Sequence, residues 1–79
     1  MARVLLFGRL SDVAGWRDRV IEAPSLSALR ARLASEDSGL GEALGGRGVQ
    51  VALDQVIVRG DAPLNAGTEV AFLPPMSGG

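Results

Sequence analysis

The sequence predicts a single α+β domain with about five strands and one main helix, followed by an extended tail. Two observations lead to this class: short apolar or alternating runs bounded by turn residues, and one stretch with leucines at helical spacing. The chain has 79 residues, no cysteine and 47% hydrophobic residues. It can therefore form one core, and packing rather than disulfides must stabilise that core.

The first segment predicts two paired strands. Residues 4–7 are an apolar run that ends at Gly8, and residues 10–15 mix turn formers with apolar residues, which predicts a loop with one helical turn. Residues 17–23 contain a β-branched segment with a charged start, which indicates an exposed edge strand that returns antiparallel to the first.

The main helix is predicted over residues 26–34. Leu26, Leu29 and Leu33 fall on one helical face, and Ser25 can accept a hydrogen bond from the first turn. The opposite face carries side chains that we expect only to be solvated: Ser27, Arg30 and Arg32.

The stretch over residues 35–48 is rich in glycine, and we expect a loop with a short second helix near residues 40–44. The glycines resemble a phosphate-binding loop only superficially, because no Gly-Lys-Ser/Thr follows and the cluster precedes a strand.

Three strands complete the domain, over residues 48–54, 56–59 and 68–73, with Asp54-Gln55 as the turn between the first two. In the last strand Val70 and Phe72 share one face, and Leu73 lies on the other. If the first set is buried, Leu73 is exposed beside the tail. We place the domain boundary after Leu73, with residues 74–79 as a flexible tail.

The tail suggests a function. Pro74 and Pro75 favour an extended backbone, and Gly78 and Gly79 have no side chain that would block a narrow channel. Six residues can reach about 20 Å, and the carboxylate of Gly79 is ionised at neutral pH, with a pKa of about 3.3 to 3.7. The pattern favours a stalk that presents an activatable acid to another protein's active site. A frayed end without a role would also account for the two glycines.

Composition disfavours several classes. The net charge is −1 and the arginines are spread along the chain, so nucleic acid is not an expected partner. Histidine, cysteine and lysine are absent, which removes the commonest metal ligands and nucleophile–base pairs. Neither a secretion signal nor an apolar run of about 20 residues is present, so we expect a cytoplasmic protein without a membrane partner.

The ending Phe72-Leu73-Pro74-Pro75, followed by Gly78-Gly79, resembles the small subunit of molybdopterin synthase, a sulfur carrier of the MoaD/ThiS ubiquitin-like family. Nearly the whole chain shares the likeness, through residues 4–7 with 10–15, 25–30, 51–54, 63–64 and 69–75. Two turns depart from the family pattern, where Asp54 replaces a common asparagine and Ala66-Gly67-Thr68 replaces Asp-Gly-Asp. The resemblance implies a β-grasp fold, a mixed sheet wrapped around the main helix with parallel first and last strands.

The resemblance also implies a cycle. An E1-like adenylyltransferase would use ATP and magnesium to adenylate Gly79, and a sulfur-donating enzyme with a persulfide would convert it to a thiocarboxylate. The large synthase subunit would then transfer the sulfur to cyclic pyranopterin monophosphate within a heterotetramer of molybdenum cofactor biosynthesis. This chain would be a non-catalytic donor that binds no cofactor or metal, with Gly78 as the permissive neighbour of Gly79.

We expect the large subunit to contact Leu73, Ile57 and the tail residues Pro74, Pro75, Met76 and Ser77. The alternation of the strand over residues 56–59 leaves both orientations of Ile57 open. Arg9 and Arg59 are further candidates for pairing with acidic groups of a partner, or are ordinary solvated arginines.

Three alternatives remain open at this point. The chain could carry sulfur for thiamine or cysteine biosynthesis, could be a ubiquitin-like modifier conjugated through Gly79, or could be a β-grasp interaction module whose tail is inert.

Overall fold

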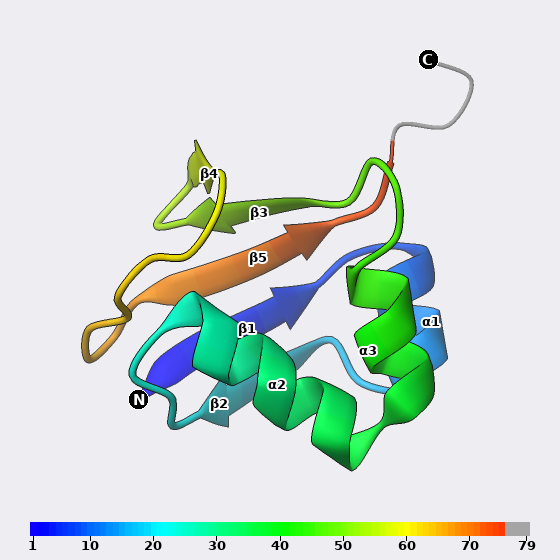
Figure 1. Ribbon diagram of the computed structural model, residues 1–79, viewed down its shortest axis with the longest axis horizontal. Helices are drawn as coiled ribbons and strands as arrows, with labels where there is room; N and C mark the ends of the chain where they lie inside the picture. Colours follow the sequence, from blue (N-terminus) through cyan, green and yellow to red (C-terminus); the bar gives the residue numbers. More distant parts are fainter. Residues whose placement is uncertain (76–79) are drawn as a thin grey trace.

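The computed structural model describes residues 1–75 and forms one five-stranded sheet, with the two helices over residues 26–44 covering one face (Figure 1). The elements follow in the order β1 (Ala2–Leu6), α1 (Arg9–Ala14), β2 (Asp18–Ile21), α2 (Leu26–Glu36), α3 (Ser38–Leu44), β3 (Gln50–Leu53), β4 (Val56–Val58) and β5 (Glu69–Leu73). The sheet order is β2-β1-β5-β3-β4, in which β1 and β5 run parallel and the other neighbours antiparallel. The predicted α+β class and mixed sheet are confirmed.

The main helix forms for the predicted reason. Leu26, Leu29 and Leu33 are all buried, and the Ser25 hydroxyl accepts a hydrogen bond from the backbone N–H of Ala28 at 3.1 Å. The helix runs to Glu36, two residues past its predicted end, and stops where Asp37 takes an extended backbone.

The second helix is longer than expected and lies directly against the first. α3 starts at Ser38 because the Asp37 carboxylate accepts a hydrogen bond from Leu40 N–H at 3.1 Å. A Cβ on Gly41 would come within 2.5 Å of the Cβ of Ala34, so only glycine permits this separation of α2 and α3.

Arg30 corrects one expectation. The sequence predicted a solvated side chain, yet Arg30 is half-buried, donates a hydrogen bond to the Leu44 carbonyl at 3.3 Å, and places its guanidinium 5.4 Å from the centre of the Phe72 ring. Arg32 likewise donates to the Glu22 carbonyl at 2.8 Å. Both arginines therefore tie α2 to neighbouring elements.

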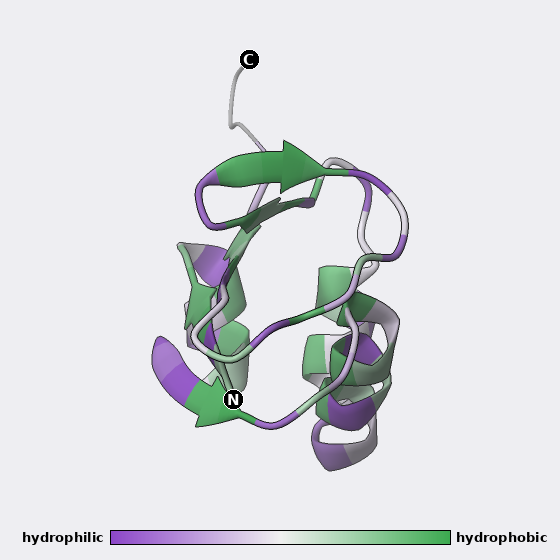
Figure 2. Cartoon of the chain, turned by 90° about the vertical axis from the view of Figure 1, so that its left-hand side faces the viewer, coloured by the Kyte–Doolittle hydropathy of each residue, from purple (hydrophilic) through white to green (hydrophobic). Residues whose placement is uncertain are grey.

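The core lies between the sheet and the helix pair α2 and α3. In the side view of Figure 2 the sheet forms one layer and the two helices form the other. Val70 and Phe72 of β5 point into it and have no exposed surface, as their parity predicted. The buried side chains that surround them come from every other named element except β4: Ala2, Val4, Leu6, Leu10, Ile21, Leu26, Leu29, Leu33, Leu40, Leu44 and Val51.

The opposite face of the sheet has no helix over it. Register places Leu5 beside Ala71, Ala71 beside Ala52, and Ala52 beside Ile57, so these four residues form a row across four strands on that face. Ile57 thus points away from the helices and is 46% exposed, which resolves the ambiguity in its predicted orientation.

One end of the sheet gathers several strand termini. β1 and β5 both finish there, and Gln50 at the start of β3 pairs with Leu73 at the end of β5. β4 runs in the same direction as β5, and its last residue, Val58, pairs with Val51, one residue inside that end. We call this the exit end. Within residues 1–75, no helix is long and apolar enough to cross a membrane.

Candidate functional site

The site begins where β5 leads into Pro74 and Pro75 at the exit end. β5 is the central strand, hydrogen-bonded to β1 and β3 on its two sides (Figure 1). A chain that leaves from the centre of a sheet is positioned by both neighbours. The backbone N–H of Phe7 also donates to the Phe72 carbonyl at 3.3 Å, which extends the β1–β5 pairing beyond the end of β1.

Two glycines lie against the two prolines. A Cβ on Gly8 would meet Cγ of Pro74 at 3.1 Å, and a Cβ on Gly48 would meet Cβ of Pro75 at 2.8 Å. Both glycines have positive φ, +55° at Gly8 and +82° at Gly48, a backbone conformation that residues with a side chain rarely adopt. We call these four residues the glycine–proline clasp. Pro74 is half-buried and Pro75 exposed, so the clasp holds the backbone without burying it.

Sequence reasoning missed the contacts of both glycines with the prolines, because it took Gly8 as the end of an apolar run and Gly48 as part of a glycine-rich loop. An isolated glycine beside a strand can mark the close approach of another backbone, and this was the available clue. The predicted boundary after Leu73 stays a prediction, although contacts with the domain continue through Pro75. Met76, Ser77, Gly78 and Gly79 lie outside the described residues, so their predicted roles also stay predictions.

The two predicted partner-binding side chains of the domain share one face. Leu73 lies two residues beyond Ala71 in β5 and so points to the same side as Ile57. Leu73 is half-buried rather than fully exposed as expected. Phe7, which sequence reasoning assigned to the first strand, lies just beyond β1 and is 44% exposed. Phe7 lies two residues after Leu5, and residues two apart in a strand point to the same face. This spacing could have identified Phe7 as a residue of the open face.

An ion pair borders this face. Arg3 on β1 donates to both carboxylate oxygens of Asp18 on β2, with the shortest distance, Nη2 to Oδ2, at 2.6 Å. The hydrogen bond from Arg3 lowers the pKa of the Asp18 carboxyl below its ordinary value. Both groups are exposed, so the pair orients two side chains more than it stabilises the fold.

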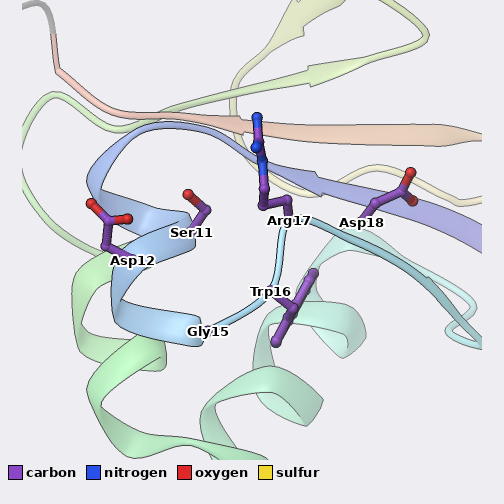
Figure 3. Close-up of a pocket in the computed structure, with 6 residues that line it drawn as sticks. All are labelled: Ser11, Asp12, Gly15, Trp16, Arg17 and Asp18. Carbon is purple, nitrogen blue, oxygen red and sulfur yellow. The ribbon is translucent and has the colours of Figure 1, made fainter.

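An open hollow of about 660 Å³ lies beside the exit end, between α1 and β2 (Figure 3). Six residues line it: Ser11, Asp12, Gly15, Trp16, Arg17 and Asp18. Trp16 is half-buried, and the Arg19 guanidinium lies 4.8 Å from the centre of its ring. The sequence has no histidine or lysine that could act as a base beside Ser11, and the Ser11 hydroxyl donates a hydrogen bond to the Gly8 carbonyl at 2.8 Å. Within residues 1–75, no three acidic side chains are grouped so as to hold a metal ion.

The chain matches several known proteins. The model of the ThiS family matches residues 4–79. The molybdopterin synthase sulfur carrier subunit of Escherichia coli K12 is 35% identical over 81 residues, which cover 100% of both chains.

Two solved structures share the fold. SAMP1 from Haloferax volcanii superposes with a TM-score of 0.83 at 23% identity, covering 99% of this chain and 98% of that one. A complex of subunits 1 and 2 of the molybdopterin-converting factor from Helicobacter pylori 26695 contains a chain with a TM-score of 0.76 and 32% identity, covering 99% and 97%. These likenesses confirm the ubiquitin-like β-grasp architecture.

Proposed function

The chain belongs to the ThiS family, and from this premise we propose that it is the sulfur carrier subunit of a molybdopterin synthase, with Gly79 as the residue that bears the sulfur. The resemblance read from the sequence is thereby confirmed at the level of the family. The observation that carries the proposal is full-length similarity to the Escherichia coli subunit, together with a family match that runs through Gly79.

The chemistry starts with a carboxylate that needs activation. An oxygen of the Gly79 carboxylate attacks the α-phosphate of ATP on an E1-like enzyme, which releases pyrophosphate and leaves an acyl-adenylate. Magnesium and ATP belong to that enzyme, and this chain binds neither. A persulfide then displaces AMP, and a thiol cleaves the resulting S–S bond, so that the sulfur stays on Gly79 as a thiocarboxylate.

The geometry supports delivery rather than catalysis by this chain. The clasp directs the chain outwards from the centre of the sheet, and the apolar face with Leu5, Phe7 and Ile57 offers a docking surface beside it. A short tail alone would bind weakly against the cost of ordering it, so a docking surface is required. The Helicobacter pylori neighbour is a complex of two subunits, which supports a large subunit as the partner.

Intact mass spectrometry tests the proposal. Full-length protein incubated with the activating enzyme, ATP and a persulfide donor should gain one oxygen-to-sulfur exchange, and the mass also locates the end of the mature chain. The matched control is a variant that lacks Gly79, whose terminal carboxylate belongs to Gly78. Equal loading of both variants, or a mature chain that continues past Gly79, would contradict the proposal. Adducts of this protein on other proteins would favour a conjugated modifier instead.

A further inference from the structure

The eight basic side chains, all arginine, divide into two sets by their internal contacts. Four have partners: Arg3 with Asp18, Arg19 with Glu36, and Arg30 and Arg32 with backbone carbonyls. The other four donate no hydrogen bond and form no ion pair within residues 1–75, and all are exposed: Arg9, Arg17, Arg47 and Arg59.

The second set lies at the exit end. Arg9 follows Gly8 and Arg47 precedes Gly48, so each is adjacent to a glycine of the clasp. Arg59 directly follows the end of β4, and Arg17 directly precedes the start of β2. Arg17 also lines a small hollow with Phe7, and Figure 3 shows its side chain extending from the β2 start across β1 in that view. We call these four residues the arginine rim.

Carboxylates mark the opposite end of the sheet. Glu22 follows the end of β2, Asp54 follows the end of β3, and Glu69 starts β5. At the exit end, Asp18 starts β2, and its carboxylate accepts hydrogen bonds from Arg3. Asp12 on α1 and Glu42 on α3 are the other carboxylates of the elements nearby. Among the charged side chains near the exit end that form no ion pair within residues 1–75, four arginines therefore outnumber the carboxylates Asp12 and Glu42.

We propose that the arginine rim docks onto a protein surface whose carboxylates surround the channel that receives the tail. This inference rests on the proposed function and specifies the charge of the partner. The apolar face beside the rim supplies contact area, and the rim orients it. The observations favour a protein over a nucleic acid, since the acidic far end would repel a long polyanion and the rim lies beside an apolar face.

Guanidinium groups that have no internal partner lose no ion pair when a partner protein binds. Charges at the border of an interface act mainly on the rate of association, and salt screens them beyond about 10 Å at 0.1 M. The association rate of this chain with its partner should therefore fall as ionic strength rises, and the rim should account for most of that dependence.

The experiment compares two double variants of identical net charge. Arg9→Gln/Arg59→Gln removes two charges from the rim, whereas Arg19→Gln/Arg32→Gln removes two arginines that already have partners within the chain. Stopped-flow association of the full chain with the activating enzyme and with the large subunit of the same organism is measured from 20 to 500 mM salt. Over this range the Debye length falls from about 20 Å to about 4 Å.

We expect the rim variant to associate about tenfold more slowly at low salt and to show a flatter salt dependence, while the control stays within about twofold. Circular dichroism would establish that both variants are folded. Equal rates for the two variants would overturn the rim while leaving sulfur loading of Gly79 intact. Tight binding of the wild type to a single-stranded DNA oligonucleotide, lost in the rim variant, would reassign the rim to nucleic acid. If the wild type binds neither partner protein, the rim and the proposed function both fail.

Discussion

Gly48 shows how one residue can determine where a tail goes. Its φ of +82° and the 2.8 Å approach of a hypothetical Cβ to Pro75 are separate constraints, and Gly15 shares only the first, with a φ of +81° and no atom within 4 Å of such a Cβ. Comparing substitutions at Gly48 and at Gly15 therefore separates the effect of backbone strain from the effect of displacing Pro75.

We predict that Gly48→Ala and Gly15→Ala lower the free energy of unfolding by a similar amount, about 1 to 2 kcal/mol, because both place a side chain at positive φ. Only Gly48→Ala should also slow sulfur loading of Gly79, by about tenfold, because misplacing a reacting group is costly in rate. Urea unfolding and timed intact mass spectra measure the two effects. Equal loading rates would show that the clasp does not direct the tail.

At the scale of single residues, the sequence predicted those features that depend only on residues nearby in the chain. The cap at Ser25 and the buried parity of Val70 and Phe72 follow from short-range rules, and both are confirmed. The contact of Arg30 with the Phe72 ring joins residues far apart in the chain, so no local pattern could reveal it. Ile57 was ambiguous because β4 is apolar throughout, as its colour in Figure 2 shows, and alternation then carries no information.

Helix packing gives the second prediction. α3 contains Gly39 and Gly41, and only Gly41 faces α2, where an added Cβ would lie 2.7 Å from the Cα of Ala34. That neighbour is backbone, which cannot rotate away, so Gly41→Ala must push the two helices apart.

We expect Gly41→Ala to destabilise the fold by about 1 to 3 kcal/mol through overpacking. Gly39→Ala should be neutral or stabilising by up to about 1 kcal/mol, because alanine favours helix and the nearest atom, an Asp37 carboxylate oxygen at 3.4 Å, leaves room. Chemical denaturation of both variants provides the comparison. A loss of stability in both, or in neither, would contradict close contact of α2 with α3 at Gly41.

At the scale of elements, the predictions were best where periodicity is long. Three leucines over two turns identified α2, whereas the six-residue α1 and the glycine-rich α3 have little periodicity and were predicted only as a helical turn and a short helix. α3 forms despite two glycines because Leu40 and Leu44 are buried and Asp37 caps its start. Tertiary packing thus outweighs propensity there.

The arrangement of the whole molecule was predicted by resemblance rather than by pattern. Parallel pairing of β1 with β5 joins the two ends of the domain, and nothing in either strand alone specifies that partner. The same pairing brings Phe7 and the clasp together around the start of the tail. The proposed site is therefore a product of topology, and its interface can be tested separately from its chemistry.

β4 allows a matched test of which face docks, because Ile57 and Val56 are neighbours on opposite sides of the sheet and both are largely exposed, at 46% and 65%. Replacing either by aspartate should leave the fold intact. On the open face the new carboxylate would lose its water when an apolar interface closes over it, and it would have no partner there. Ile57→Asp should therefore weaken binding to the large subunit by about tenfold or more, whereas Val56→Asp should change it less than about twofold. Isothermal titration calorimetry measures both affinities, and equal affinities would place the partner somewhere other than the face that carries Ile57.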